Sequence, residues 1–418
     1  MPKYIIEGGK KLEGTTYVSG SKNASLPIMA ATILNAGTTK LYNIPQIRDT
    51  KITQEILRFL GCKVKKSSEK IEINAKNINK KEIPENLMHQ MRSTVILAGA
   101  LIGRFKEARF SYPGGCDIGA RPIDLHLESF KKMGINIEEE AGFIICKCDK
   151  IVGANIDLDF PSVGATENII LAAVLAEGVT KISNAAMEPE IVDLANCLNK
   201  MGAKIEGAGT NIIQITGVKK LKDISYQVMP DRIEAGTLLC MVAATGGKIT
   251  LNHISPEHIS PVLNKLRKCG CKIDEQRDTV YLEAPKKLKS VDIKTMPYPG
   301  FPTDMQSVFS SMLVTAKGSS MIIENIFENR YRFIPELKRM GAKANIEGKT
   351  AVITGVKKLS GTTVKSPDLR GGAALVLAGL IAKGKTEVTD IEYILRGYEK
   401  LDEKLRSLGA NIYKEEGE

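Results

Sequence analysis

The stretch LANCLNKMGAKIE, residues 194–206, decides the fold together with five counterparts elsewhere in the chain. Four apolar residues between Leu194 and Met201 recur at the i, i+3, i+4, i+7 spacing of one helix face. Gly202 follows, as expected for a left-handed helix C-cap, and a strand is predicted after it. The same ending occurs six times, as FLGCKV, KMGINI, KMGAKI, KCGCKI, RMGAKA and SLGANI.

These endings mark an internal repeat. The six glycines are spaced 68 to 73 residues apart: Gly61, Gly134, Gly202, Gly270, Gly341 and Gly409. A second recurring feature is an apolar helix that ends in glycine before a strand, as in VLAEGVTKISNA. Each repeat is therefore predicted to contain a strand, a helix, a strand, a helix and two strands, with one apolar face on both helices. A single unit cannot bury those faces alone, so three units around a common axis are expected.

Six such repeats predict an α/β protein of two pseudo-threefold domains, in agreement with a length of 418 residues. The chain start, YIIEGGKKLEGTTYVSG at residues 4–20, resembles the end of a repeat. If the repeats close circularly, one domain spans residues 21–229 and the other combines residues 1–20 with 230–418. Two chain crossings would then form a hinge.

The charge of the chain suits anionic partners but does not by itself choose between them. The net charge of +11 suits either phosphorylated metabolites or nucleic acid. The chain has no Trp and only 5% aromatic residues, so platforms for base stacking are scarce. The N-terminus has no apolar core of signal-peptide length, and no apolar run reaches the ~18 residues of a membrane helix. We therefore expect a cytoplasmic protein without membrane insertion.

Eight cysteines are expected to remain thiols in the cytoplasm. Cys146 with Cys148 and Cys269 with Cys271 have C-x-C spacing, but no histidine is near either pair. Zinc sites usually show wider spacing and a second ligand pair. Most of these cysteines are expected to be small core residues, and no metal site is predicted.

Polar turns are predicted at the start of the first helix of each repeat. Their sequences are SGSKNAS, HQMRST, FPSVGAT, VMPDRIE, PGFPTDM and SPDLRGG. Ser and Asp at such turns are ordinary N-caps. Capping does not require Lys22, Arg92, Arg232 or Arg370, because cations at a helix N-terminus oppose the helix dipole. Several such placements favour anionic ligands at these turns.

A second set of arginines lies in the turns after the second strand of a repeat: Arg48, Arg121, Arg330 and Arg396. Arginine binds carboxylate and phosphate through two parallel hydrogen bonds, although surface solvation explains Arg48 equally well. The second repeat is longer here, with 31 residues between Gly103 and Gly134 against 23 to 25 elsewhere. The extra length falls in SYPGGCDIGARPIDLH, which predicts an exposed loop. Cys116 in that loop is predicted to be a reactive thiol, because Arg121 would lower its pKa.

Several of these motifs resemble the UDP-N-acetylglucosamine 1-carboxyvinyltransferases. They are SGSKNASLP, YPGGCDIGARPIDLH, PSVGATEN, MPDRIEAGT, FPTDMQ, FENRYRFIPELKRMGA, SPDLRGGAALVLAG and LRGYEKLDEKLRSLGA. The resemblance covers the whole chain. It implies two inside-out α/β barrels joined by two crossings, the fold also found in 5-enolpyruvylshikimate-3-phosphate synthase. It also implies transfer of the enolpyruvyl group of phosphoenolpyruvate to UDP-N-acetylglucosamine, at the start of peptidoglycan synthesis.

The resemblance assigns roles to individual residues. Cys116 matches the acid that protonates the enol, and Asp304 matches the residue near the sugar 3-hydroxyl, where it acts as a base or only orients the hydroxyl. The residues that match phosphoenolpyruvate ligands are Lys22, Asn23, Arg121, Arg330, Arg370 and Arg396. The residues that match UDP-N-acetylglucosamine ligands are Arg92, Arg121, Pro122, Ile123, Asp124, Leu125, Ser162, Val163, Gly164, Asp304 and Ile326.

The implied reaction is an addition followed by an elimination, which needs an acid, a base and cations around the phosphate. Lys22 is the expected catalytic cation. No metal or organic cofactor is expected, and a monomer is expected. Three alternatives stay open at this point: the shikimate-pathway synthase, a ring-shaped nucleic-acid clamp, and a catalytically reduced paralogue. Retention of Lys22, Cys116, Asp304 and Arg396 disfavours the last of these.

Overall fold

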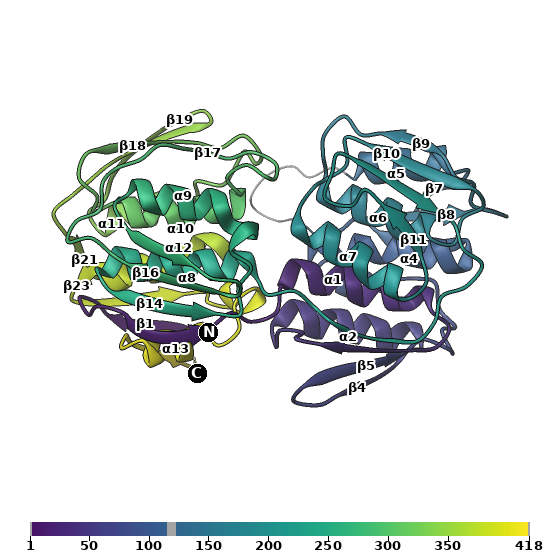
Figure 1. Cartoon of the computed structure of the whole chain (residues 1–418), viewed down its shortest axis with the longest axis horizontal. Helices are drawn as coiled ribbons and strands as arrows, with labels where there is room; N and C mark the ends of the chain where they lie inside the picture. The colour runs from purple at the N-terminus through teal and green to yellow at the C-terminus, as the bar shows by residue number, and fades with distance from the viewer. Residues whose placement is uncertain (1, 115–122, 417–418) are drawn as a thin grey trace. The chain divides into compact units, whose positions relative to one another are not determined.

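A computed structural model describes residues 2–114 and 123–416, which form two compact units (Figure 1). The first unit contains residues 20–114 and 123–229, and the second contains residues 2–19 and 230–416. The described chain therefore passes from one unit to the other after residue 19 and again after residue 229.

The elements of the first unit follow the predicted alternation. Its helices are α1 (Lys22–Ala31), η1 (Thr32–Leu34), α2 (Arg48–Leu60), α3 (Glu85–Met88), η2 (Arg92–Val95), α4 (Ile96–Phe105), α5 (Asp124–Lys132), α6 (Val163–Ala173) and α7 (Pro189–Lys200). Its strands are β3 (Thr38–Tyr42), β4 (Lys63–Lys66), β5 (Lys70–Asn74), β6 (Glu107–Ser111), β7 (Asn136–Glu140), β8 (Phe143–Lys147), β9 (Asn155–Asp157), β10 (Val179–Ser183), β11 (Lys204–Glu206), β12 (Ile212–Thr216) and β13 (Ile224–Gln227).

The second unit repeats the pattern. Its helices are α8 (Arg232–Thr245), η3 (Pro256–Ile259), α9 (Ser260–Lys268), α10 (Thr303–Leu313), α11 (Ile334–Arg339), α12 (Leu369–Ile381), η4 (Ile394–Arg396) and α13 (Leu401–Ser407). Its strands are β1 (Lys3–Glu7), β2 (Glu13–Tyr17), β14 (Lys248–Asn252), β15 (Lys272–Glu275), β16 (Thr279–Glu283), β17 (Ile293–Lys294), β18 (Ser319–Ile323), β19 (Lys343–Glu347), β20 (Thr350–Thr354), β21 (Leu359–Ser360), β22 (Thr363–Lys365), β23 (Ala382–Lys383), β24 (Lys385–Thr389) and β25 (Asn411–Glu415).

Each unit has three main sheets with a common strand order, except that the sheet β6-β8-β7 lacks the outer parallel strand. In the first unit the orders are β13-β3-β5-β4, β6-β8-β7 and β11-β12-β10-β9; in the second they are β15-β16-β14-β2, β17-β18-β20-β19 and β22-β24-β1-β25. The sheet of the third repeat is representative: β9 is parallel to β10, and β12 is antiparallel to it. Ile182 lies opposite both Ile156 and Ile213, and all three are buried, so one face of the sheet is apolar. The predicted six-repeat architecture is confirmed.

The chain start completes the last repeat, as the sequence predicted. Strand β1 pairs antiparallel with both β24 and β25, where other repeats use the second strand of their final hairpin. The strands at the two crossings are exchanged. Strand β2 precedes α1 in the chain but pairs parallel with β14, while β13 precedes α8 but pairs parallel with β3.

The first helix of each repeat lies at the centre of its unit. In α8, every residue from Arg232 to Ala243 is buried, and in α12 the same holds from Arg370 to Leu380. The expectation that both helices of a repeat have a single apolar face is therefore wrong for the first helices. Three of them pack together inside the sheets, so no side of them faces solvent. The second helices, such as α2 and α7, keep an exposed polar face.

The six repeat glycines adopt the predicted left-handed conformation, with φ between +82° and +109°. Most cysteines are core residues, as expected: six of the seven described thiols are buried, and Cys148 is half-buried. Among the described residues, no helix combines the length and hydropathy that a membrane span requires.

We expect Gly202→Ala to lower the free energy of unfolding by about 1–2 kcal/mol, because an L-residue is strained in the left-handed region. Gly202 has φ +102°, and an added Cβ would meet nothing within 4 Å, so the loss comes from the backbone alone. Chemical denaturation measures it. Gly202→Asn is the control and should lose less, since Asn tolerates this conformation. Equal losses in the two variants would contradict the backbone explanation.

Candidate active site

In the first unit, the predicted ligand-binding turns lie at one end of three parallel helices. The Gly99 amide of α4 donates to Asn168 Oδ1 of α6 at 2.9 Å, and one turn later Gly103 lies against Leu171. The guanidinium of Arg104, at the end of α4, donates to the carbonyl of Ile33 just after α1. Because α1, α4 and α6 run the same way, their N-termini meet at one end of the unit. The positive ends of three helix dipoles meet there as well.

Lys22 is held in place by a buried carboxylate. It is the first residue of α1, and Ser21 caps the helix by accepting a hydrogen bond from the Ala24 amide at 3.2 Å. Lys22 Nζ lies 3.0 Å from Asp49 Oδ2, and only 1% of the Asp49 side chain is exposed. Capping thus accounts for Ser21, whereas Lys22 needs a carboxylate to offset its charge at this helix end. Asn23 follows on the same first turn and is half-buried.

The predicted nucleotide-sugar residues of α5 and α6 adjoin one another. Ile123, Asp124 and Leu125 lie at the start of α5, and Ser162, Val163 and Gly164 at the start of α6. The next residue of α5, His126, packs against Gly164, where an added Cβ would lie 3.2 Å from His126 Cε1. A larger residue at position 164 would crowd the His126 ring.

The buried His126 ring is oriented by an amide. Asn168 Nδ2 lies 2.7 Å from His126 Nδ1 and also donates to the Val95 carbonyl, while its Oδ1 accepts from Gly99. Since the amide nitrogen donates, Nδ1 accepts, and the neutral ring carries its proton on Nε2. Arg92 begins η2, which runs directly into α4, so it also lies at this end of the unit.

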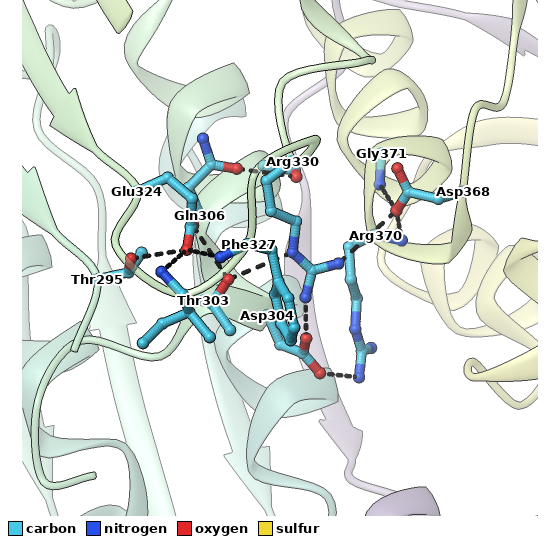
Figure 2. A network of polar contacts seen from close by, with 12 residues as sticks. Thr295, Thr303, Asp304, Gln306, Glu324, Phe327, Arg330, Asp368, Arg370 and Gly371 are labelled. Carbon is cyan, nitrogen blue, oxygen red and sulfur yellow. Dashed lines mark hydrogen bonds and ion pairs between the residues drawn. The ribbon is translucent and has the colours of Figure 1, made fainter. Parts of the chain in front are cut away.

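In the second unit, one carboxylate bridges two buried arginines (Figure 2). Asp304 lies in the first turn of α10, where its Oδ1 accepts a hydrogen bond from Arg330 Nη2. Its Oδ2 accepts from Arg370 Nη2 at 2.8 Å. Both arginine side chains are 4% exposed, while Asp304 is 25% exposed. Asp304 is thus the most exposed member of an ion triad with Arg330 and Arg370.

The turn before α12 holds the second arginine of the triad. Asp368 Oδ1 caps α12 by accepting from the amides of Arg370 at 2.9 Å and Gly371 at 3.0 Å. It also lies 3.9 Å from Arg330 Nη1. Asp368 therefore caps the helix through backbone amides, and the Arg370 side chain takes no part in the cap. Within the described part of the chain, buried Arg370 Nη1 has no hydrogen-bond acceptor, which suits an anionic ligand.

An aromatic ring adjoins Arg370. The Arg370 guanidinium lies 5.3 Å from the Tyr398 ring centroid, and the Tyr398 hydroxyl lies 3.0 Å from Thr237 Oγ1. Burial lowers the pKa of Arg370, but Asp304 and Tyr398 raise it by more, so the net pKa is above its ordinary value. Arg370 therefore stays charged. Arg396 ends η4, two residues before Tyr398, and is half-buried.

The predicted residues thus form two groups, one in each unit. The structure brings Ile123–Leu125 together with Ser162–Gly164, and it brings Asp304 together with Arg330 and Arg370. Cys116, Arg121 and Pro122 lie outside the described residues. Sequence reasoning missed Asp49, His126, Glu324 and Tyr398, which contact predicted residues or hold them in place. Asp49 and His126 each follow a residue that was considered, so only adjacency could have suggested them.

Comparison with known proteins identifies the family of the chain. The family model described as EPSP synthase (3-phosphoshikimate 1-carboxyvinyltransferase) matches residues 6–405. UDP-N-acetylglucosamine 1-carboxyvinyltransferase 2 of Caldanaerobacter subterraneus subsp. tengcongensis is 52% identical over 413 residues, with 99% of each chain covered. The UDP-N-acetylglucosamine 1-carboxyvinyltransferase of Clostridium botulinum is 48% identical, again with 99% of each chain covered.

Solved structures show the same fold. The enolpyruvyl transferase NikO from Streptomyces tendae has a TM-score of 0.90 at 24% identity, covering 100% of this chain and 99% of that one. EPSP synthase from Acinetobacter baumannii has a TM-score of 0.78 at 18% identity, with both chains fully covered. The predicted EPSP synthase-like fold is confirmed. The chain is an enolpyruvyl transferase of the EPSP synthase family, and within it the chain belongs with the UDP-N-acetylglucosamine 1-carboxyvinyltransferases.

Proposed function

We propose that this enzyme transfers the enolpyruvyl group of phosphoenolpyruvate to the 3-hydroxyl of UDP-N-acetylglucosamine and releases phosphate. This is the committing step of peptidoglycan synthesis. The observation that carries the proposal is 52% identity across 99% of the chain to a relative named for this activity. The ion triad of Asp304, Arg330 and Arg370 supports it, because it offers a carboxylate and two fixed cations side by side.

The proposed chemistry gives the thiol and the cationic residues separate roles. The acceptor hydroxyl attacks the central carbon of the donor while Cys116 protonates the methylene carbon; loss of phosphate and of a proton then restores the double bond. Lys22, Arg121 and Arg396 are proposed to bind the phosphate, with Asn23 beside Lys22. Arg330 and Arg370 are proposed for the donor carboxylate, since two guanidinium groups side by side match its two oxygens.

The acceptor is proposed to bind at the remaining positions. Helix N-termini favour phosphate groups, and the start of α6 at Ser162, Val163 and Gly164 lies next to the start of α5. The other proposed ligands of the nucleotide sugar are Arg92, Arg121, Pro122, Ile123, Asp124, Leu125, Asp304 and Ile326.

Asp304 is proposed to have two successive partners. In the described conformation both of its oxygens accept from buried guanidinium groups, so it is a poor proton acceptor. A donor carboxylate on Arg330 and Arg370 would take over these hydrogen bonds. Asp304 would then be released to orient the acceptor hydroxyl or to take its proton.

We propose further that the enzyme works as a cytoplasmic monomer. Proton transfer and charge stabilisation suffice for the reaction, so neither metal nor organic cofactor is included. The two compact units are proposed to act as the domains expected at 21–229 and at 1–20 with 230–418.

Phosphate release from phosphoenolpyruvate tests the function. We expect release that depends on UDP-N-acetylglucosamine, with the carboxyvinyl ether of that sugar as the product. Shikimate 3-phosphate is the control acceptor, and it should support no release. Release with shikimate 3-phosphate alone would assign the chain to the other branch of the family.

Cys116→Ala should lower turnover by more than about 100-fold, as is usual when a general acid is lost. Binding of UDP-N-acetylglucosamine should persist, because the thiol is not proposed to contact it; calorimetric titration measures this. Cys148→Ala is the matched control, since that half-buried thiol lies on the loop after β8. Near-normal turnover in Cys116→Ala would remove the acid role.

Asp304→Asn should lower kcat by about 100-fold or more, in the range of a lost general base. The KM for phosphoenolpyruvate should fall as well, because the amide no longer competes for Arg330 and Arg370 as a charged group. Steady-state kinetics separates the two effects. Asp274→Asn, which removes an exposed charge on β15, should change neither. A raised donor KM in Asp304→Asn would show that Asp304 supports the arginines and does not compete for them.

A further inference from the structure

A buried carboxylate lies behind the ion triad without belonging to it. Glu324 directly follows β18 and is 1% exposed. It accepts four hydrogen bonds, from Thr295 Oγ1 at 2.9 Å, the Ile326 amide at 2.8 Å, the Phe327 amide at 3.2 Å and Thr303 Oγ1 at 3.0 Å. Figure 2 shows it beside Thr295 and Thr303. Among the described residues, Glu324 has no direct ion pair, so hydroxyl and amide groups alone stabilise its charge.

The hydrogen bond between Thr303 and Glu324 continues, through a second hydrogen bond, to Arg330 of the ion triad. Arg330 Nε donates to Thr303 Oγ1 at 3.3 Å, and that hydroxyl donates its single proton to Glu324 Oε2. The resulting chain has one direction, from guanidinium to hydroxyl to carboxylate. A buried cation and a buried anion are therefore coupled through one hydroxyl group.

The hydrogen bond to Thr303 uses only Nε of Arg330. The outer edge of the guanidinium, formed by Nη1 and Nη2, faces the carboxylates of the candidate site. With Nε bound to Thr303, Nη2 reaches Asp304 and Nη1 lies 3.9 Å from Asp368. Thr303 and Asp304 are also consecutive at the start of α10, where Pro302 provides no side-chain cap. Glu324 is thus the anchor of this helix start as well as of Arg330.

We propose that Glu324 is a positioning residue for the reaction. Acting through Thr303, it orients Arg330 and the Asp304 helix start; through the amides of Ile326 and Phe327, it fixes the loop that carries a proposed acceptor contact. The proposal rests on the proposed function of Arg330 and Asp304. Neither Glu324 nor Thr303 needs to touch a substrate.

Two threonines make a matched test, because each donates its hydroxyl to a different oxygen of Glu324. Thr303→Val cuts the link to Arg330. Thr295→Val removes a hydroxyl that also accepts from the Asn325 amide, so it disturbs the fold at least as much without touching Arg330. Thr303→Ser keeps the hydroxyl and should restore the link.

In Thr303→Val, we expect kcat/KM for phosphoenolpyruvate to fall by about 10- to 100-fold, since small misplacements of a binding group cost this much. The Kd for UDP-N-acetylglucosamine should change far less. Thr295→Val and Thr303→Ser should stay near wild type, although Thr295→Val should lower Tm as much as Thr303→Val does. Equal losses of kcat/KM in the two valine variants would reduce Glu324 to a purely structural role.

Crystal structures of the two valine variants give a readout that does not depend on turnover. We expect Arg330 to leave Asp304 in Thr303→Val and to keep that contact in Thr295→Val. An unmoved Arg330 in Thr303→Val would overturn the positioning role. If the wild-type protein releases no phosphate, the proposed function is refuted instead. The position of Arg330 in the Thr303→Val crystal structure would still test the link between Glu324 and Arg330.

Discussion

The molecule depends on the burial of helices that are apolar on every side. Helices such as α8 and α12 have no polar face, so they are stable only where other elements cover them completely. One repeat supplies a single sheet, which covers one side. Three repeats enclose three helices, which explains why each unit has three main sheets. The parallel packing of these helices then brings their N-termini together, and the polar turns of distant repeats become neighbours.

This arrangement concentrates positive charge at the helix N-termini, and carboxylates of the protein itself balance it. Helix N-termini are already positive, yet the chain adds Lys22 at one of them and Arg370 at another. Each is balanced by a carboxylate from a different element: Asp49 faces Lys22, and Asp304 faces Arg370. A phosphate or carboxylate ligand offers the same kind of partner. The protein thus holds internal anions where anionic ligands are proposed to bind.

Sequence patterns predicted the fold better than the site. A glycine after a helix commonly adopts the left-handed C-cap conformation, and all six repeat glycines do so. The circular closure by β1 was also predictable, because local sequence at the chain start matches a repeat end. The expectation of one apolar face was wrong for the central helices, because three of them pack against one another and the sheets cover their other sides. The partners of the arginines could not be predicted, because residues 304, 330 and 370 become neighbours only through tertiary packing.

The buried charges constrain how the reaction cycle proceeds. An unpaired guanidinium inside a protein costs several kcal/mol, so Arg330 and Arg370 need a counter-charge in every state. Asp304 supplies it to both arginines in the described conformation, Asp368 lies 3.9 Å from Arg330 Nη1, and Glu324 is linked to Arg330 through Thr303. If a donor carboxylate takes over the outer edges of the arginines as proposed, the Thr303 link would remain behind Arg330. Exchange of the outer partner at a fixed inner anchor would then allow Asp304 to leave without disturbing Arg330, the arginine proposed to bind the donor.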